Sequence, residues 1–322
     1  MTVTRINVAL ALGILLAALL SLMSGKVWVP FGEWLGGDLR SLIIMELRLP
    51  RTVLAIAIGA ALGLSGAVMQ GYLRNPLADP GLFGVSSSAA LGAVSSLYFG
   101  YAVSAFLLPA FALAGAATGM ALLALLAGRS ASLILFTLAG IIISSLTGSL
   151  TALMISLAPT PFAASEIITW LMGALTDRSW DDVRIALPIM IVGAVVLSLT
   201  GRALDALTLG EDAARSLGVD TRRLQLLVII GIGCCVGASV ASAGIIGFVG
   251  LIVPHLVRPL VANRPSAVLL PSALAGALLV LVADSLVRIM PTASELRLGI
   301  AMSLLGTPFF LALLLRMRRG LA

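Results

Sequence analysis

Residues 51–74 have the sequence RTVLAIAIGAALGLSGAVMQGYLR, in which an uncharged run extends from Thr52 to Leu73 between two arginines. About 20 consecutive apolar residues in a helix cross the hydrocarbon core of a bilayer. The run lacks the period-2 alternation that marks the strands of a membrane barrel. It is therefore typical of a transmembrane helix.

The composition of the whole chain agrees with this interpretation. Of the 322 residues, 60% are hydrophobic and only 11% are charged. Soluble domains carry about 25% charged residues, so the composition excludes both a soluble globule and a disordered chain. We expect an all-α, polytopic membrane protein with a single transmembrane domain over residues 1–322.

The other uncharged runs predict the number of helices. Four further runs, including residues 6–25, have the length of one crossing, and three longer ones, such as 80–128, have room for two. The first run is longer than a signal-peptide core and lacks a clear cleavage site, so we expect it to be retained. About ten helices are predicted, at residues 6–25, 52–72, 83–100, 104–127, 133–157, 184–201, 223–243, 245–262, 268–289 and 297–315.

The basic residues predict an orientation. With the N-terminus in the cytoplasm, 12 of the 20 lysines and arginines fall on the inner side and 8 on the outer side. This bias favours a multi-pass membrane protein with both termini in the cytoplasm. A basic inner face explains the net charge of +6, so no nucleic-acid partner is expected.

The chain lacks the motifs of common enzymes. Lys26 is its only lysine and His255 its only histidine, and no G-x-x-x-x-G-K-[ST], H-E-x-x-H or G-x-S-x-G motif occurs. An intramembrane protease that pairs Ser86 with His255 is an alternative, although serines in membrane helices mostly serve helix packing. We therefore expect no enzyme activity. The adjacent Cys234 and Cys235 are interpreted as small apolar fillers.

Polar residues gather in three segments between the uncharged runs. In the first, Arg48 and Arg51 could anchor a helix at the membrane interface or offer their guanidinium groups to a carboxylate. The second, residues 70–88, contains two prolines and three glycines, so it either lines a pathway or forms an ordinary loop.

The third segment, residues 205–223, is the longest polar stretch of the chain. Thr208 and Glu211 fit a capping box at the start of a short helix, and Gly218 would end that helix. Such a helix could either seat in a groove on a partner protein or lie in solvent as part of a loop.

Several longer motifs occur in a characteristic order along the chain. They are RLPR at 48–51, GAALGLSGAVMQ at 59–70, RNPLADPGLFGVSS at 74–87, GIIGFVGLIVPHLVR at 244–258, ADSLVR at 283–288 and ELRLGI at 295–300. Over residues 40–316 the chain resembles the FecCD-type permeases, which are the membrane subunits of type II ABC importers for iron–siderophores, haem and cobalamin.

The resemblance implies the type II ABC importer permease fold, with ten helices per subunit and a homodimer whose pathway lies at the dimer interface. It also implies a place in a bacterial inner (cytoplasmic) membrane, with two ATP-binding cassette subunits on the cytoplasmic side and a periplasmic substrate-binding protein on the other. ATP and Mg²⁺ would be bound by the ATPase subunits, so no cofactor and no metal site are expected in this chain.

The resemblance also assigns candidate site residues. Arg48, Arg51 and Arg288 stand where the family has arginines that pair with glutamates of the binding protein, and Asp284 is expected to orient Arg288. Arg297 departs from the proline that many relatives have. The cytoplasmic gate is assigned to Asn75, Leu77, Ser130 and Ser132, and contact with the ATPase to Thr208, Glu211, Asp212, Arg215, Leu217, Gly218 and Val219 within the coupling segment 205–223.

A permease that works by alternating access is therefore expected. One alternative is a secondary transporter without an ATPase, which would need buried titratable groups for ion coupling. Another is a receptor or scaffold that transports nothing. No residue distinguishes a siderophore, haem or cobalamin as the cargo, although the family favours an iron chelate. His255 is either an axial haem ligand or a hydrogen-bonding residue at a helix end.

Overall fold

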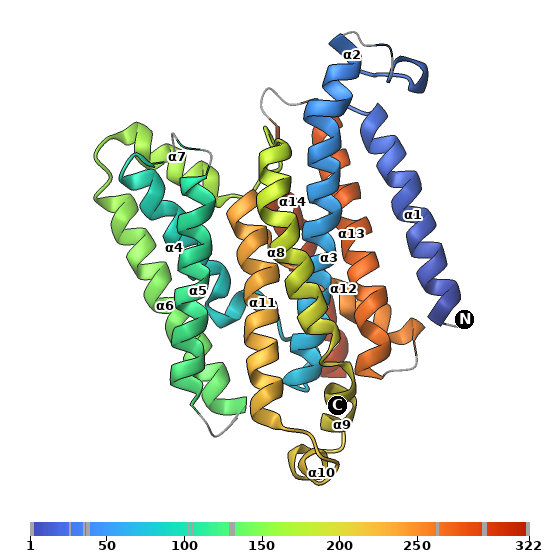
Figure 1. Ribbon diagram of the computed structural model, residues 1–322, viewed down its shortest axis with the longest axis vertical. Helices are drawn as coiled ribbons and strands as arrows, with labels where there is room; N and C mark the ends of the chain where they lie inside the picture. Colours follow the sequence, from blue (N-terminus) through green and yellow to red (C-terminus); the bar gives the residue numbers. More distant parts are fainter. Residues whose placement is uncertain are drawn as a thin grey trace.

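A computed structural model describes residues 3–319 except 26, 35, 37–38, 102–103, 105, 129–132, 262–263 and 292–294. Every regular element within this part of the chain is a helix, which confirms the all-α class. The long helices run up and down the longest axis of the molecule (Figure 1).

The first half of the chain forms a series of helices joined by short loops. Its elements are α1 (Val3–Met23), η1 (Phe31–Glu33), α2 (Leu39–Leu42), the π-helical turn η2 (Ile43–Arg48), α3 (Leu49–Tyr72), η3 (Pro80–Phe83), α4 (Val85–Tyr98), α5 (Leu107–Ala127), α6 (Leu133–Ser156) and α7 (Pro161–Leu171).

The second half continues in the same way. Its elements are α8 (Trp180–Ser198), α9 (Gly201–Leu207), α10 (Glu211–Ser216), α11 (Thr221–Ala243), α12 (Val249–Val257), η5 (Arg258–Leu260), α13 (Pro265–Ile289) and α14 (Leu298–Arg319).

Each of the ten predicted segments overlaps a helix, but the helices differ in length. Among the described residues, six helices are long and apolar enough to cross a membrane, or seven if α8 and α9, bent by 43°, form one span. α4 has 14 residues and α12 has 9, so both are shorter than a full crossing. The count of about ten crossings thus stays a prediction. The sequence analysis did not predict α7 and α9.

Close backbone contact sets the packing of α3 against α13. A Cβ atom added to Gly59 would lie 2.2 Å from the carbonyl oxygen of Gly276, and one added to Gly276 would lie 2.2 Å from the oxygen of Gly59. Any side chain at either position would therefore push the two helices apart. Small residues at such a crossing are the usual means by which membrane helices approach one another.

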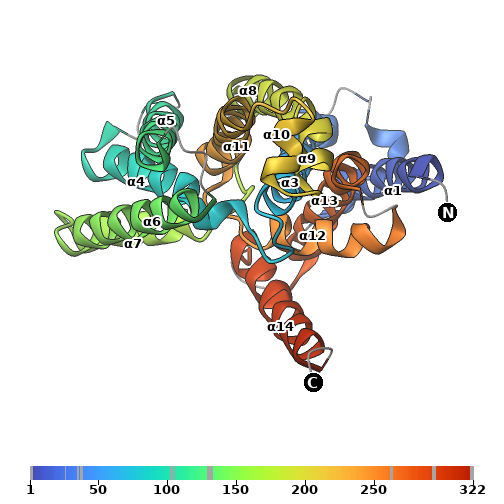
Figure 2. The same cartoon turned by 90° about the horizontal axis from the view of Figure 1, so that it is seen from below.

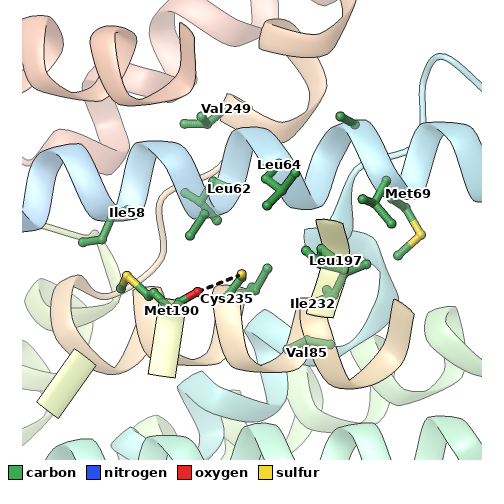
Figure 3. Packing of buried hydrophobic residues seen from close by; sticks show 14 of the residues in the cluster. Ile58, Leu62, Leu64, Met69, Val85, Met190, Leu197, Ile232, Cys235 and Val249 are labelled. Atoms are coloured by element: carbon green, nitrogen blue, oxygen red, sulfur yellow. Dashed lines mark hydrogen bonds between the residues drawn. The ribbon is translucent and has the colours of Figure 1, made fainter. Parts of the chain in front are cut away.

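The apolar core lies around α3, where the helix is surrounded on several sides (Figure 3). The Sγ atom of Cys235 on α11 lies 3.7 Å from the carbonyl oxygen of Met190 on α8, and both Cys234 and Cys235 are free thiols. The core contains apolar side chains from five helices that belong to one cluster. They are Ile58, Leu62, Leu64 and Met69 of α3, Met190 and Leu197 of α8, Ile232 and Cys235 of α11, Val85 of α4, and Val249 of α12.

The helices form two groups when seen along the bundle. α4, α5, α6 and α7 lie together on one side, the other helices lie around α3, and α14 projects from the second group (Figure 2). α1 begins and α14 ends in the half of the molecule nearer α10, which lies at one end of the bundle, whereas α2 lies at the opposite end (Figure 1). We call these the α10 end and the α2 end.

Candidate functional sites at the two ends of the bundle

Three arginines from different parts of the chain are buried at the α2 end. Arg48 closes η2, Arg51 lies in the first turn of α3 and Arg288 lies in the last turn of α13. Their exposed fractions are 7%, 8% and 5%. Because a buried charge is costly unless it is paired, each guanidinium group needs partners inside the protein.

Asp284 is the common partner of two of these arginines. Its fully buried carboxylate accepts a bidentate pair of hydrogen bonds from Arg51, with Nε 3.0 Å from Oδ2 and Nη2 2.9 Å from Oδ1. Arg288 Nη2 donates to Oδ2 at 2.7 Å. The expected orientation of Arg288 by Asp284 is confirmed. Glu295 adds a second carboxylate, 2.9 Å from Arg51 Nη2.

Backbone carbonyl groups at the end of α1 complete the arrangement. Arg48 Nη1 donates to the oxygens of Leu22 and Met23 at 2.8 and 2.9 Å, and Arg288 Nη1 donates to that of Ser21 at 3.0 Å. The last carbonyl groups of a helix have no partner within the helix, so the arginines supply donors to these acceptors. The oxygen of Met23 also accepts from the amide of Val29 at 3.2 Å. We call Arg48, Arg51, Arg288, Asp284 and Glu295 the arginine cluster.

The arginine cluster joins the ends of α1, α3 and α13 and carries three positive charges against two negative ones. All three guanidinium groups are engaged within the chain and are nearly shielded from solvent. Pairing with glutamates of a binding protein stays a prediction, and it would require these groups to exchange or extend their contacts. The sequence analysis missed Glu295 because no local spacing links it to Arg51.

At the α10 end, residues 73–79 form the loop between α3 and η3. The side chain of Asn75 accepts from the amide of Leu77 at 3.0 Å, and that of Asp79 accepts from Gly81 at 2.7 Å and caps η3. These are the side-chain-to-backbone turns that Asn and Asp favour. The 73–79 loop is thus an ordered turn rather than a continuation of the helix.

Both described gate candidates border an open cavity of about 380 Å³ between this loop and α6. Asn75 is exposed and Leu77 is partly exposed. The other lining residues are Leu73, Ala78 and Phe83 and, from residues 133–141 of α6, Leu133, Ile134, Thr137, Leu138 and Ile141. The other two candidates, Ser130 and Ser132, lie outside the described residues.

The start of α10 differs from the expected capping box. The helix begins at Glu211 after Gly210, whose φ of 104° is accessible mainly to glycine, and no side chain caps it. The hydroxyl of Thr208 instead donates to the carbonyl oxygen of Asp205 at 2.7 Å, at the end of α9. The prediction was wrong because Thr208 is the C-cap residue of the preceding helix, α9.

The remainder of α10 presents polar and apolar side chains outward. Leu209 and Leu217, at the two ends of the helix, are 67% and 65% exposed. Gly218, with φ 84°, ends the helix as expected, and the amide of Val219 donates to the oxygen of Ala214 at 3.0 Å. Asp212 and Arg215 are exposed as well, so α10 is a short surface helix with two leucines at its ends.

The structure also shows the contacts of His255 and Arg297, two residues noted in the sequence analysis. The ring of His255 packs edge-on against Phe309, with 5.9 Å between the centroids, and within the described residues its side chain makes no hydrogen bond. The expected hydrogen bond at a helix end is therefore absent there. Arg297 precedes α14, and its carbonyl oxygen accepts from Ile300 and Ala301 at 3.1 Å, so arginine is compatible with this turn.

The fold and its two polar ends define a class, namely an all-helical protein of several membrane-spanning helices. The model of the FecCD transport family matches residues 13–316, and the chain belongs to this family. It is a transmembrane permease of the ABC transporter type. The related proteins are transport permeases rather than enzymes.

Three relatives and one solved structure illustrate the similarity. The chain is 39% identical to the uncharacterized ABC transporter permease YvrB of Bacillus subtilis (strain 168), over 90% of this chain and 84% of the relative. It is 38% identical to the Fe(3+) dicitrate permease FecD of Escherichia coli (strain K12), over 97% and 100%. It is 37% identical to the vitamin B12 permease BtuC of Salmonella paratyphi A, over 97% and 95%.

The structural comparison agrees with the sequence comparison. A metal-chelate-type ABC transporter in an inward-facing conformation superimposes with a TM-score of 0.87 and 32% identity. The match covers 97% of this chain and 99% of that one.

Proposed function

We propose that the chain is the permease subunit of an ATP-driven importer that moves an iron chelate or cobalamin from a periplasmic binding protein to the cytoplasm. The observation that supports this most directly is the surface helix α10 at one end of the bundle, whose Glu211 lies 3.9 Å from Arg74 of the 73–79 loop. Relatives that carry Fe(3+) dicitrate and vitamin B12 support the cargo class.

The proposed assembly contains two copies of this chain, two ATP-binding cassette subunits and one binding protein. In it the chain crosses the inner membrane about ten times, with α4 and α12 as short crossings, and both termini lie in the cytoplasm. The homodimer is supported by α14, which projects from the bundle with large exposed apolar side chains such as Leu304 (66%) and Leu311 (57%).

The proposed mechanism is alternating access. Closure of the ATPase subunits moves α10, and the attached loop opens a path at Asn75 and Leu77. ATP and Mg²⁺ act in the ATPase subunits, and this chain supplies the path and two docking faces. At the α2 end, the surplus positive charge of the arginine cluster attracts an acidic face of the binding protein.

ATP hydrolysis by the purified complex in lipid nanodiscs tests this proposal. The binding protein is added empty or loaded with ferric dicitrate, haem or cobalamin, and we expect one loaded form to raise the hydrolysis rate. Copurification of the ATPase subunits with this chain is part of the same experiment. The proposal fails if the ATPase subunits do not copurify, or if no loaded form changes the rate.

A pair of variants tests whether the binding protein docks on the arginine cluster. Arg48→Gln removes one positive charge of the arginine cluster, so we expect it to weaken stimulation by the binding protein. Arg184→Gln serves as the control, because Arg184 lies at the same end, is 76% exposed and pairs with its neighbour Asp181. Equal stimulation of both variants would rule out docking through the cluster.

A further inference from the structure

Arg74 connects the two features of the α10 end. It is the second residue of the 73–79 loop, and its Nη2 atom lies 3.9 Å from Oε1 of Glu211, the first residue of α10. The other carboxylate oxygen of Glu211 lies 3.8 Å from Nη2 of Arg215. The carboxylate of Glu211 thus lies between an arginine of the loop and an arginine of α10.

We infer that Arg74 is a positioning residue that ties the 73–79 loop to α10, so that a displacement of α10 is passed to the loop. The inference rests on the proposed function, because it names the side chain through which that function connects its ATPase side to its gate. Neither residue of the pair has been assigned this role by the family comparison.

The backbone holds Arg74 in a fixed place. Its φ of 51° lies in the left-handed region, where residues other than glycine are uncommon. Its amide donates to the oxygen of Gly71 at 3.3 Å, and that of Asn75 donates to Gln70 at 3.1 Å, so both close the end of α3. Arg74 is therefore fixed by its backbone to the C-terminal end of α3.

The end of α3 is held in place by the buried side-chain amide of Gln70. The side chain of Gln70 donates to the carbonyl oxygens of Gly250 and Leu251 at 3.3 Å each and accepts from Arg258 at 3.0 Å. The start of the 73–79 loop is thus fixed to α12 and η5. A pull on Arg74 would act on the exposed part of the loop rather than on α3.

Aromatic rings on both sides of the loop contact α6. Phe136 of α6 lies edge-on to Tyr72, with 5.4 Å between the centroids, and 5.3 Å from Phe83 of η3. A Cβ atom at Gly140, one turn further along α6, would lie 2.8 Å from the ring of Phe83. Movement of the loop would therefore displace α6, which lines the other wall of the cavity.

Gly210 is a candidate hinge between α10 and its neighbour α9. The carboxylate of Asp205 on α9 accepts from the amide and the hydroxyl of Ser266 at 2.9 and 2.6 Å, which fixes α9 to the start of α13. Gly210, with φ 104° and nothing within 4 Å of an added Cβ, separates α9 from α10. A hinge at Gly210 would let α10 turn while α9 stays in place.

The test measures cargo uptake and ATP hydrolysis together in the complete complex in liposomes. We expect Arg74→Glu and Glu211→Arg each to lower the uptake per ATP hydrolysed by about two- to fivefold, the range that an exposed ion pair supports. The double variant should recover most of the loss. Arg202→Glu is the control, because Arg202 is exposed on α9 and should leave the ratio unchanged.

A second variant guards against misfolding. Arg74→Gly keeps the left-handed backbone conformation without strain and removes the charge, so it should also lower the ratio, but by less than Arg74→Glu, which adds repulsion with Glu211. The inference is overturned if Arg74→Gly keeps the wild-type ratio, or if the double variant is no better than the single ones. Its failure differs from that of the proposed function, in which the wild-type complex itself shows no ATP-dependent uptake.

Discussion

Asp284 shows how a single residue holds a buried charge network. Its fully buried carboxylate receives Arg51 and Arg288, which come from different helices. Removing water from such groups is expensive, and their mutual attraction offsets this cost only while every partner is present. The three side chains therefore depend on one another.

Asp284→Asn should destabilise the protein strongly. Both arginines would then face a neutral amide, and breaking a buried pair in this way typically costs about 3–5 kcal/mol. The measurement is the free energy of unfolding in detergent, followed by circular dichroism against denaturant.

Asp181→Asn provides the comparison for this experiment. Asp181 pairs with Arg184 on α8, but both side chains are more than half exposed. We expect its loss to cost less than about 1 kcal/mol. Equal stabilities of the two variants would mean that the arginine cluster contributes little to folding.

At the scale of residues, contacts between neighbours on one helix could be predicted from their spacing, but contacts between distant parts of the chain could not. The four-residue separation of Asp284 and Arg288 indicated their pairing. The bidentate contact of Arg51 with Asp284 joins residues 233 positions apart and depends on how α3 meets α13. For Thr208, a local pattern was misleading. The sequence has the spacing of a capping box, but α10 begins after Gly210 and has no side-chain cap.

Among the elements, the crossing of α3 and α13 has the least room for change. We expect Gly59→Ala to destabilise the protein by about 1–3 kcal/mol, since the new methyl group would meet the backbone of Gly276. Thermal unfolding of the purified variant measures this. Gly148→Ala on α6 is the matched control, because nothing lies within 4 Å of its added Cβ. An unchanged melting temperature for Gly59→Ala would contradict the close packing.

The surface helix α10 leads to a different prediction. Leu217 is 65% exposed at its end, and we expect Leu217→Asp to abolish copurification of the ATPase subunits, because a charge would replace an apolar contact. Leu42→Asp, at a leucine of α2 that is 56% exposed, should leave copurification intact. Retention of the ATPase subunits by Leu217→Asp would show that α10 is not their binding site.

Uncharged runs predicted most of the helices because burial in lipid and burial in the core both require apolar side chains. The same criterion missed α7, which starts with Thr160 as a side-chain cap and Pro161 in its first turn. Glu166 interrupts the apolar run there, so no helix was predicted for this segment. α9 was missed because Arg202 and Asp205 mark it as polar.

For the whole molecule, the order of helices followed from the sequence, whereas their arrangement did not. The projection of α14 from the bundle and the grouping of α4 to α7 depend on contacts between distant segments (Figure 2). No periodicity within one helix could indicate them. The family resemblance supplied the expected partners, and the geometry of the α10 end supports a path from α10 to the 73–79 loop.

Uptake by reconstituted liposomes tests the central claim, which is that this permease takes its energy from separate ATPase subunits and its cargo from a binding protein. The complete complex, with ATP inside the liposomes and loaded binding protein outside, should accumulate the cargo. The permease alone should not, even with an imposed proton or sodium gradient. Accumulation by the permease alone would contradict the account.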